Sequence, residues 1–208
     1  LSVGVNVTDG NSETELYTAG ANAAYKGEDN EVLLGARYAY GEADGEKNTD
    51  NGNVFAQYNR LLNEALYGYV KADLGFDDVA EVDYRLLVGP GVGYYLVQTD
   101  DLDLNVEAGA TYLREDVGGE EDDSVLLRLA QRGEYRISET AKVWESVEYL
   151  PEFEDFDVYL LNAEVGVEAA MNASLSLRVV VTDKYDSEPA PDREDNDVAV
   201  NVALVYTL

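Results

Sequence analysis

The sequence predicts an all-β protein, specifically a 12-stranded antiparallel up-and-down transmembrane β-barrel with both termini at the rim that carries the short turns. Three observations support this fold class. Apolar and polar residues alternate almost from end to end, several alternating segments exceed ten residues, and the connections between them alternate between short and long. Soluble sheets typically use strands of about five or six residues, so strands this long favour a large closed barrel. The 208 residues fit one barrel domain spanning 1–208.

The alternation is clearest in the segment 196–208. Val198, Val200, Val202 and Leu204 share one phase there, while the residues between them are small or polar. Side chains of successive strand residues point to opposite faces, so one face of this segment is continuously apolar. A helix would need a repeat near 3.6, which is not found over a useful length.

Segments with this alternation recur along the whole chain. We expect strands at about 1–9, 13–26, 31–42, 53–61, 65–77, 82–97, 101–116, 124–137, 141–151, 156–171, 174–185 and 196–208.

The connections differ in length on the two rims. Short turns are expected at 26–30, 62–64, 98–100, 138–140 and 171–174, whereas 42–52, 115–123, 151–155 and 186–195 are longer on average and strongly acidic. Bacterial outer-membrane barrels have short periplasmic turns and longer external loops. With twelve strands, both termini then lie at the periplasmic rim.

Tyrosine placement gives an independent indication of a membrane. In the apolar phase, Tyr residues gather near the two ends of the strands, at 17, 38, 40, 84, 112, 149 and 159 on the long-loop side and at 25, 58, 94, 135 and 206 on the other. Two belts of amphipathic rings suit the two interfaces of a bilayer. Tyr is also a good strand former, which explains its abundance but not its position.

The opposite phase carries most of the basic residues, with acids nearby, and in a barrel these side chains point into the lumen. Buried charges persist when they are paired or hydrated, so we expect a lumen filled by ion pairs and water. The lumen candidates are Arg37, Lys71, Asp73, Arg85, Glu107, Arg128, Arg132, Glu134, Arg136, Glu164, Glu168 and Arg178.

Two features leave a narrow channel open as an alternative to a packed polar lumen. Gly89, Gly91 and Gly93 face inward together, which relieves crowding or leaves space beside the arginines of 124–137. In the channel alternative, an arginine group formed by Arg128, Arg132 and Arg136 faces Glu107 and Glu164 and sets the electrostatic field of a constriction.

Composition excludes several classes of protein. The chain has no Cys and no His, so catalysis by thiol or imidazole is excluded, and we expect no enzymatic activity. With 43 acidic against 14 basic residues the net charge is -29. Nucleic-acid phosphates must be met by Lys and Arg, so a nucleic acid is not an expected partner.

The long connections contain clusters of carboxylates. Such oxygen-rich loops can bind Ca²⁺ or Mg²⁺ weakly, although none matches an EF-hand loop and no other metal or cofactor is expected. The simpler interpretation is that negative charge keeps an exposed rim solvated, and a third is that these loops share divalent cations with lipopolysaccharide phosphates. The candidate residues are Asp44, Glu46, Asp50, Glu120, Glu121, Asp122, Asp123, Asp192, Glu194 and Asp195.

Particular motifs resemble a known family over nearly the whole chain. They are Gly41-Glu-Ala-Asp-Gly-Glu-Lys-Asn-Thr-Asp-Asn, Tyr149-Leu-Pro-Glu, and Asp183-Lys-Tyr-Asp-Ser-Glu-Pro-Ala-Pro followed by Asn196-Asp. They are similar to domain-of-unknown-function family 481, whose members include salt-stress-induced outer-membrane proteins of Gram-negative bacteria. The resemblance implies an outer-membrane barrel that contacts lipid, lipopolysaccharide and the barrel-assembly machinery. It supplies no catalytic or binding residues.

Three functions remain open at this point. The first is a barrel for envelope or salt-stress adaptation, and the second is a narrow porin-like channel for small polar or cationic solutes. The third is a soluble closed barrel that binds an apolar ligand, with the two faces inverted. No signal peptide is visible, so for the outer-membrane alternatives we expect the mature form.

Overall fold

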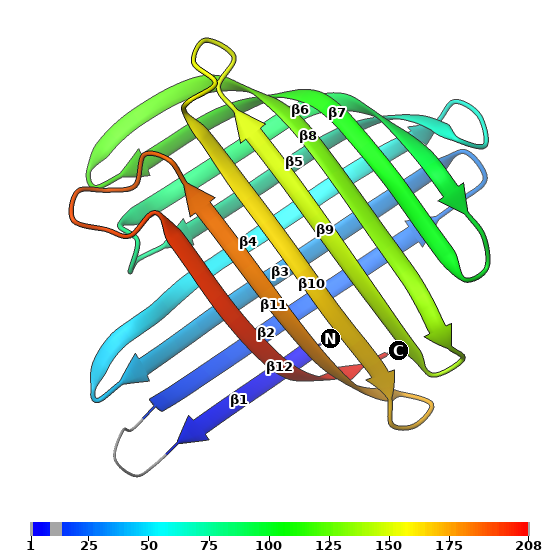
Figure 1. Cartoon of the computed structure of the whole chain (residues 1–208), viewed down its shortest axis with the longest axis horizontal. Helices are drawn as coiled ribbons and strands as arrows, with labels where there is room; N and C mark the ends of the chain where they lie inside the picture. Colours follow the sequence, from blue (N-terminus) through cyan, green and yellow to red (C-terminus); the bar gives the residue numbers. More distant parts are fainter. Residues whose placement is uncertain (1, 9–13, 208) are drawn as a thin grey trace.

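The computed structural model describes residues 2–8 and 14–207, and within these ranges the protein is built from antiparallel strands (Figure 1). The strands are β1 (Ser2–Thr8), β2 (Thr14–Lys26), β3 (Asn30–Ala43), β4 (Glu46–Leu61), β5 (Leu66–Asp77), β6 (Val82–Gln98), β7 (Leu102–Val117), β8 (Glu120–Ser138), β9 (Ala141–Pro151), β10 (Tyr159–Ala170), β11 (Leu175–Asp186) and β12 (Asn196–Tyr206). No helix in the described part of the chain is long and apolar enough to cross a membrane.

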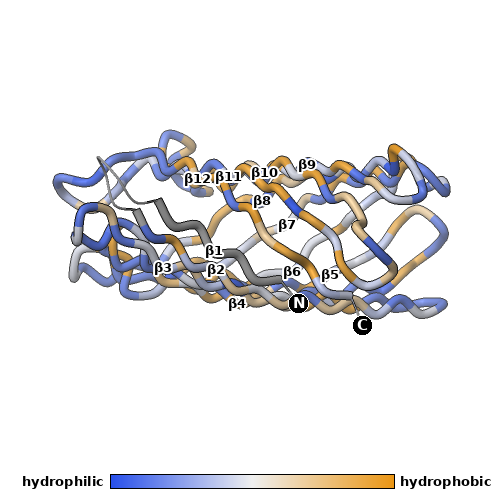
Figure 2. Tube along the Cα trace, turned by 90° about the horizontal axis from the view of Figure 1, so that it is seen from below, coloured by the Kyte–Doolittle hydropathy of each residue, from blue (hydrophilic) through white to orange (hydrophobic). Residues whose placement is uncertain are grey.

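Each strand pairs with its neighbours in sequence, and β1 pairs with β12 to close the barrel. The closing pair is short, with register at Ser2↔Val205 and Val3↔Leu204, and the two strands diverge beyond it (Figure 1). In Figure 2 the barrel is flattened, with β9–β12 along one side and β2–β6 along the other. The predicted all-β antiparallel barrel is confirmed.

Two of the long acidic connections expected from the sequence are instead extended hairpins. The segment 42–52 turns tightly at Asp44 and Gly45, with φ of 53° and 80°, and β4 already begins at Glu46. The segment 115–123 turns at Gly118 and Gly119, with φ of 63° and 81°. Two central residues with positive φ match the tight turns that continue the twist of paired strands. The expectation of loops here is therefore wrong, whereas 152–158 and 187–195 lie outside the strands.

The outer face of the barrel is apolar. Val70, Val92, Val165 and Val181 are exposed there although they lie in the middle of their strands. Figure 2 shows hydrophilic rims at both ends of the view, with hydrophobic residues concentrated between them. In the described residues, the inverted faces expected of a soluble closed barrel that binds an apolar ligand are not found.

Eight of the twelve tyrosines of the apolar phase are exposed on this outer face, and Tyr40, Tyr84, Tyr149 and Tyr159 are half-buried. Those exposed near the short turns are Tyr25, Tyr58, Tyr94, Tyr135 and Tyr206, and those exposed towards the other rim are Tyr17, Tyr38 and Tyr112. The sheet therefore presents an apolar band bounded by amphipathic rings.

Candidate functional site

The centre of the lumen holds an ion-pair network around Arg128 of β8. Its Nη1 lies 2.7 Å from Oε2 of Glu107 on β7, and its Nε lies 2.5 Å from Oε1 of Glu148 on β9. The side chains of Arg128 and Glu107 are only 7% and 8% exposed. A guanidinium presents several N–H donors in a fixed plane, so one arginine can hold two carboxylates.

Strand register explains why Arg128 reaches both acids. Ala130 lies directly opposite Glu107 on one side and Glu148 on the other. Arg128 is two residues before Ala130 and shares its inward face, so each carboxylate is a diagonal neighbour of the guanidinium. The short Ala130 side chain leaves room for both contacts.

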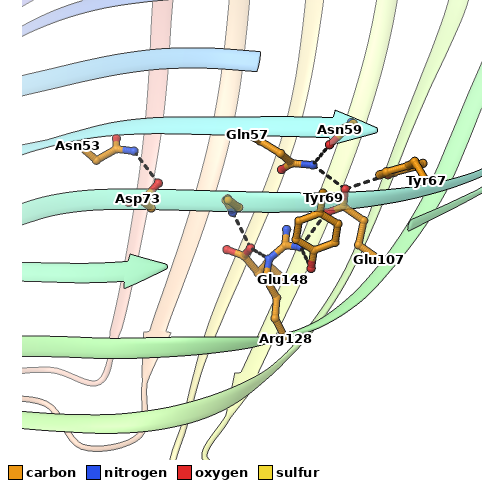
Figure 3. Close-up of polar contacts among 10 residues, drawn as sticks. Asn53, Gln57, Asn59, Tyr67, Tyr69, Asp73, Glu107, Arg128 and Glu148 are labelled. Carbon is orange, nitrogen blue, oxygen red and sulfur yellow. Dashed lines mark hydrogen bonds and ion pairs between the residues drawn. The ribbon is translucent and has the colours of Figure 1, made fainter. Parts of the chain in front are cut away.

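The network continues onto β4 and β5 (Figure 3). Lys71 Nζ lies 2.7 Å from Oε1 of Glu148, and the Tyr67 hydroxyl donates to Oε1 of Glu107 at 2.8 Å. Gln57 Nε2 donates to the same Glu107 oxygen at 2.8 Å, and Arg128 Nη1 donates to the Tyr69 hydroxyl at 2.8 Å. Charged side chains of β5, β7, β8 and β9 and the Gln57 amide of β4 are thereby joined along the inner wall.

The inward glycines of β6 make space for this network. A Cβ on Gly93 would lie 2.1 Å from Cζ of Tyr67, and one on Gly91 would lie 2.3 Å from Cζ of Tyr69. Both tyrosines are buried. The space that the sequence left open as a channel beside the arginines is therefore filled by two tyrosine rings.

A small cavity lies beside this network. The cavity bounded by Lys71, Asp73, Arg128 and Glu148 measures ≈ 10 Å³, with Leu87, Thr111 and Leu150 completing its lining. About 10–15 Å³ is the minimum that holds one water molecule. Asp73 accepts a hydrogen bond from Asn53 Nδ2 at 3.4 Å in the same region.

A second cluster lies on β9–β11 and reaches across the lumen. Trp144 Nε1 donates to Oε1 of Glu164 at 2.7 Å, and Arg37 of β3 lies 3.3 Å from Oε2 of the same carboxylate. Strands β3 and β10 are not neighbours in the sheet, so this ion pair spans the interior. Arg178 Nη2 pairs with Glu168 at 2.6 Å on the adjacent strands.

The arginine group proposed for a constriction does not form. Arg128 contacts Glu107 as expected, but Arg132 lies 3.9 Å from Glu134 and Glu164 is paired with Arg37. Arg136 is exposed near the short-turn rim. Arginines four residues apart on one strand are about 13 Å apart along it, so they occupy different levels of the lumen.

A third cluster, at the short-turn end, was not identified from the sequence. Glu31 is buried and accepts hydrogen bonds from Asn59 Nδ2 at 3.1 Å and from the Tyr95 hydroxyl at 2.8 Å. Lys26 Nζ lies 3.2 Å from its other oxygen. The position of Glu31 at the start of its strand, opposite Asn59 in register, could have pointed to it.

At the other rim, Arg85 pairs with two acids that are distant in sequence. Its Nη2 lies 2.6 Å from Oδ2 of Asp186, and its Nε pairs with Glu115. Below this pair, four inward leucines form a buried apolar layer: Leu113, Leu126, Leu150 and Leu160.

The acidic candidates do not gather into a metal site. Among the residues that the structure describes, no group of three or more Asp or Glu side chains is arranged to hold a metal ion. Asp44 and Glu46 belong to the β3–β4 hairpin, and Asp50 pairs there with Lys47 at 3.2 Å. Glu120, Glu121, Asp122 and Asp123 begin β8, while Asp192, Glu194 and Asp195 lie between β11 and β12.

Four members of the central network were absent from the sequence-based candidates: Gln57, Tyr67, Tyr69 and Glu148. Alternation provided the signal, since Tyr67 and Tyr69 share the phase of Lys71 and Asp73, which places them inside. Their hydrogen-bond partners lie on other strands and have no counterpart in the local sequence.

Comparisons with known proteins agree with this architecture. A family model described as "Protein of unknown function, DUF481" matches residues 1–208. None of the curated proteins compared with the chain matches it.

Solved structures with a similar fold are outer-membrane barrels. A NanC porin aligns with a TM-score of 0.61 at 9% identity, covering 100% of this chain and 99% of the porin. A KdgM porin aligns at 0.54 with 12% identity and the same coverage. The translocator domain of the autotransporter NalP from Neisseria meningitidis aligns at 0.51 with 13% identity, covering 100% of this chain and 85% of that one. At these identities the likeness establishes the fold alone.

Proposed function

We propose, given that the chain belongs to the family of proteins of unknown function DUF481, that it is a non-catalytic outer-membrane barrel for envelope or salt-stress adaptation. In this proposal twelve strands span the membrane as a single domain over residues 1–208, with both termini at the periplasmic rim. The apolar outer band and its tyrosine rings support the membrane location. The expected partners are outer-membrane lipid, lipopolysaccharide and the barrel-assembly machinery.

The observation that carries the lumen part of this proposal is the burial of Arg128 between Glu107 and Glu148. Two acids held by one buried arginine, with tyrosine rings against the wall beside them, act as a fixed polar plug. A plug of this kind keeps the barrel impermeable to large solutes while leaving its charged interior hydrated.

A narrow channel for small polar or cationic solutes is the second candidate. It is favoured by the side chain of Arg37, which is 56% exposed although it points into the barrel. The two porins of similar fold also favour it, as does an excess of acidic residues that would attract cations.

Planar-bilayer recording separates the two candidates. The plug proposal predicts no steady single-channel steps from the unmodified protein, and new conductance when Arg128 is replaced by Gly. Steady cation-selective steps from the unmodified protein would overturn the plug and establish the channel. Arg132→Gly is the matched control, because Arg132 lies 3.9 Å from its acid and outside the central network.

A further inference from the structure

A hollow lies at the long-loop rim, above the leucine layer. It is a cavity of ≈ 450 Å³, here called the vestibule. Cavities of about 300–1,000 Å³ are the size that small organic ligands occupy in proteins. The residues that line the vestibule differ from those that line the small cavity beside the central network, except for Leu150, which lines both.

The floor of the vestibule is apolar. Leu113, Leu126, Leu150 and Leu160 line it, and all four belong to one buried apolar cluster on β7–β10. In a lumen otherwise lined by charge, this layer gives an apolar ligand surface a place to pack.

Its roof is also apolar and is formed by the loop between β11 and β12. Pro189, Ala190 and Pro191 line the vestibule from above, and Ala190 is only 3% exposed. The loop is fixed at both sides of the mouth. The Tyr159 amide donates to the Ser187 hydroxyl at 2.7 Å, and Arg193 pairs with Glu81 of the β5–β6 connection.

The walls between floor and roof are acidic, and the lining includes no Lys or Arg. Arg85 pairs with two of these carboxylates, on Glu115 and Asp186, and Arg114 lies 3.2 Å from Glu121. The remaining wall carboxylates make no ion pair within the described residues, and they are Glu120, Asp122, Glu152 and Glu188.

We propose that the vestibule binds an organic cation with an apolar body, the body packing between the leucine floor and the proline roof and the cationic group facing the unpaired wall carboxylates. Acidic walls alone would favour any cation, and apolar surfaces alone would favour any apolar molecule. Their combination in one chamber selects for both properties. The inference goes beyond the proposed function, because a plugged or a conducting lumen would leave the vestibule unchanged.

The test is calorimetric titration of the purified full-length protein in detergent micelles with benzyltrimethylammonium chloride. Tetramethylammonium chloride carries the charge without the apolar body, and benzyl alcohol carries the ring without the charge. We expect benzyltrimethylammonium to bind at least about tenfold more tightly than either, since each lacks one of the two contributions.

The matched variants separate the vestibule from the general charge of the rim. E152Q/E188Q removes two unpaired wall charges, and E46Q/E154Q removes two charges from the same rim outside the vestibule. We expect the first pair to weaken binding by about tenfold and the second to have little effect, because nearby charges interact most strongly. Circular dichroism of each variant checks that the barrel is folded.

Three results would overturn the proposal: no binding of benzyltrimethylammonium, equal binding of tetramethylammonium, or equal weakening by both double variants. Bilayer recording on the same preparations tests the plug separately. Cation binding with steady conductance in the unmodified protein would retain the vestibule and reject the plug. Absence of both conductance and cation binding would retain the plug and reject the vestibule.

Discussion

Arg128 Nη1 donates to Oε2 of Glu107 across 2.7 Å, and these two charged side chains are among the most buried in the lumen. They come from adjacent strands, β8 and β7, yet their network extends to Lys71 on β5 through Glu148 on β9. Removing one partner of a buried ion pair leaves an uncompensated charge, which costs more than the pair contributes.

Arg128→Met should therefore destabilise the barrel strongly. We expect a loss of about 3–5 kcal/mol in the free energy of unfolding, because Glu107 and Glu148 both lose a buried cationic partner. Urea unfolding in micelles, followed by circular dichroism, measures this loss. Arg132→Met is the control and should cost less than about 1 kcal/mol, since the Arg132 side chain is 52% exposed. Equal losses in the two variants would show that the central network contributes no more to the free energy of unfolding than an exposed ion pair does.

Gly93→Ala should destabilise the same network from the β6 side. The added Cβ would meet the Tyr67 ring, which is 1% exposed and hydrogen-bonded to Glu107, so the ring cannot move freely. We expect a cost of about 1–3 kcal/mol, as for overpacking of a filled interior. Gly68→Ala on the neighbouring strand β5 is the control, since the atom nearest to its added Cβ would be 3.9 Å away. If Gly93→Ala were as stable as Gly68→Ala, the packing of Tyr67 against β6 would be wrong.

Acidification should weaken cation binding in the vestibule. The negative charge of the vestibule wall is carried entirely by carboxylates, and the cation is proposed to face the unpaired ones. Protonation removes negative charge, so affinity for benzyltrimethylammonium should fall as the pH is lowered from about 7 to about 4. Titrations across this range in the unmodified protein measure the effect. An affinity that stays constant or rises would show that the wall carboxylates do not face the ligand.

The sequence predicts the faces of this barrel better than its contacts. Period-two alternation placed Arg128, Glu107 and Lys71 inside and the valines outside, because a strand residue has only two directions to point. It could not predict that Arg37 meets Glu164 across the lumen. That contact depends on how far the strands are staggered and how strongly the barrel is flattened.

The turns show a different kind of error. Asp44-Gly45 and Gly118-Gly119 are strong signals for two-residue hairpin turns, yet the acidic composition around them favoured long loops. Both segments pair as strands up to the turn, since charged side chains are tolerated on strands that extend beyond the apolar band into water. The local turn chemistry was therefore the better guide.

The central claim is that the apolar face of the barrel meets hydrocarbon and the charged face is enclosed. The chain has no Cys, so a nitroxide spin label can be placed at one introduced cysteine at a time. On β11, the Val181 side chain points outward and is exposed. The side chain of the next residue, Thr182, points into the barrel. In lipid vesicles, the label on Val181→Cys should collide with dissolved oxygen and be shielded from a water-soluble nickel chelate, whereas the label on Thr182→Cys should be shielded from oxygen. Equal access of the nickel chelate to both labels, or the reverse pattern, would contradict the account.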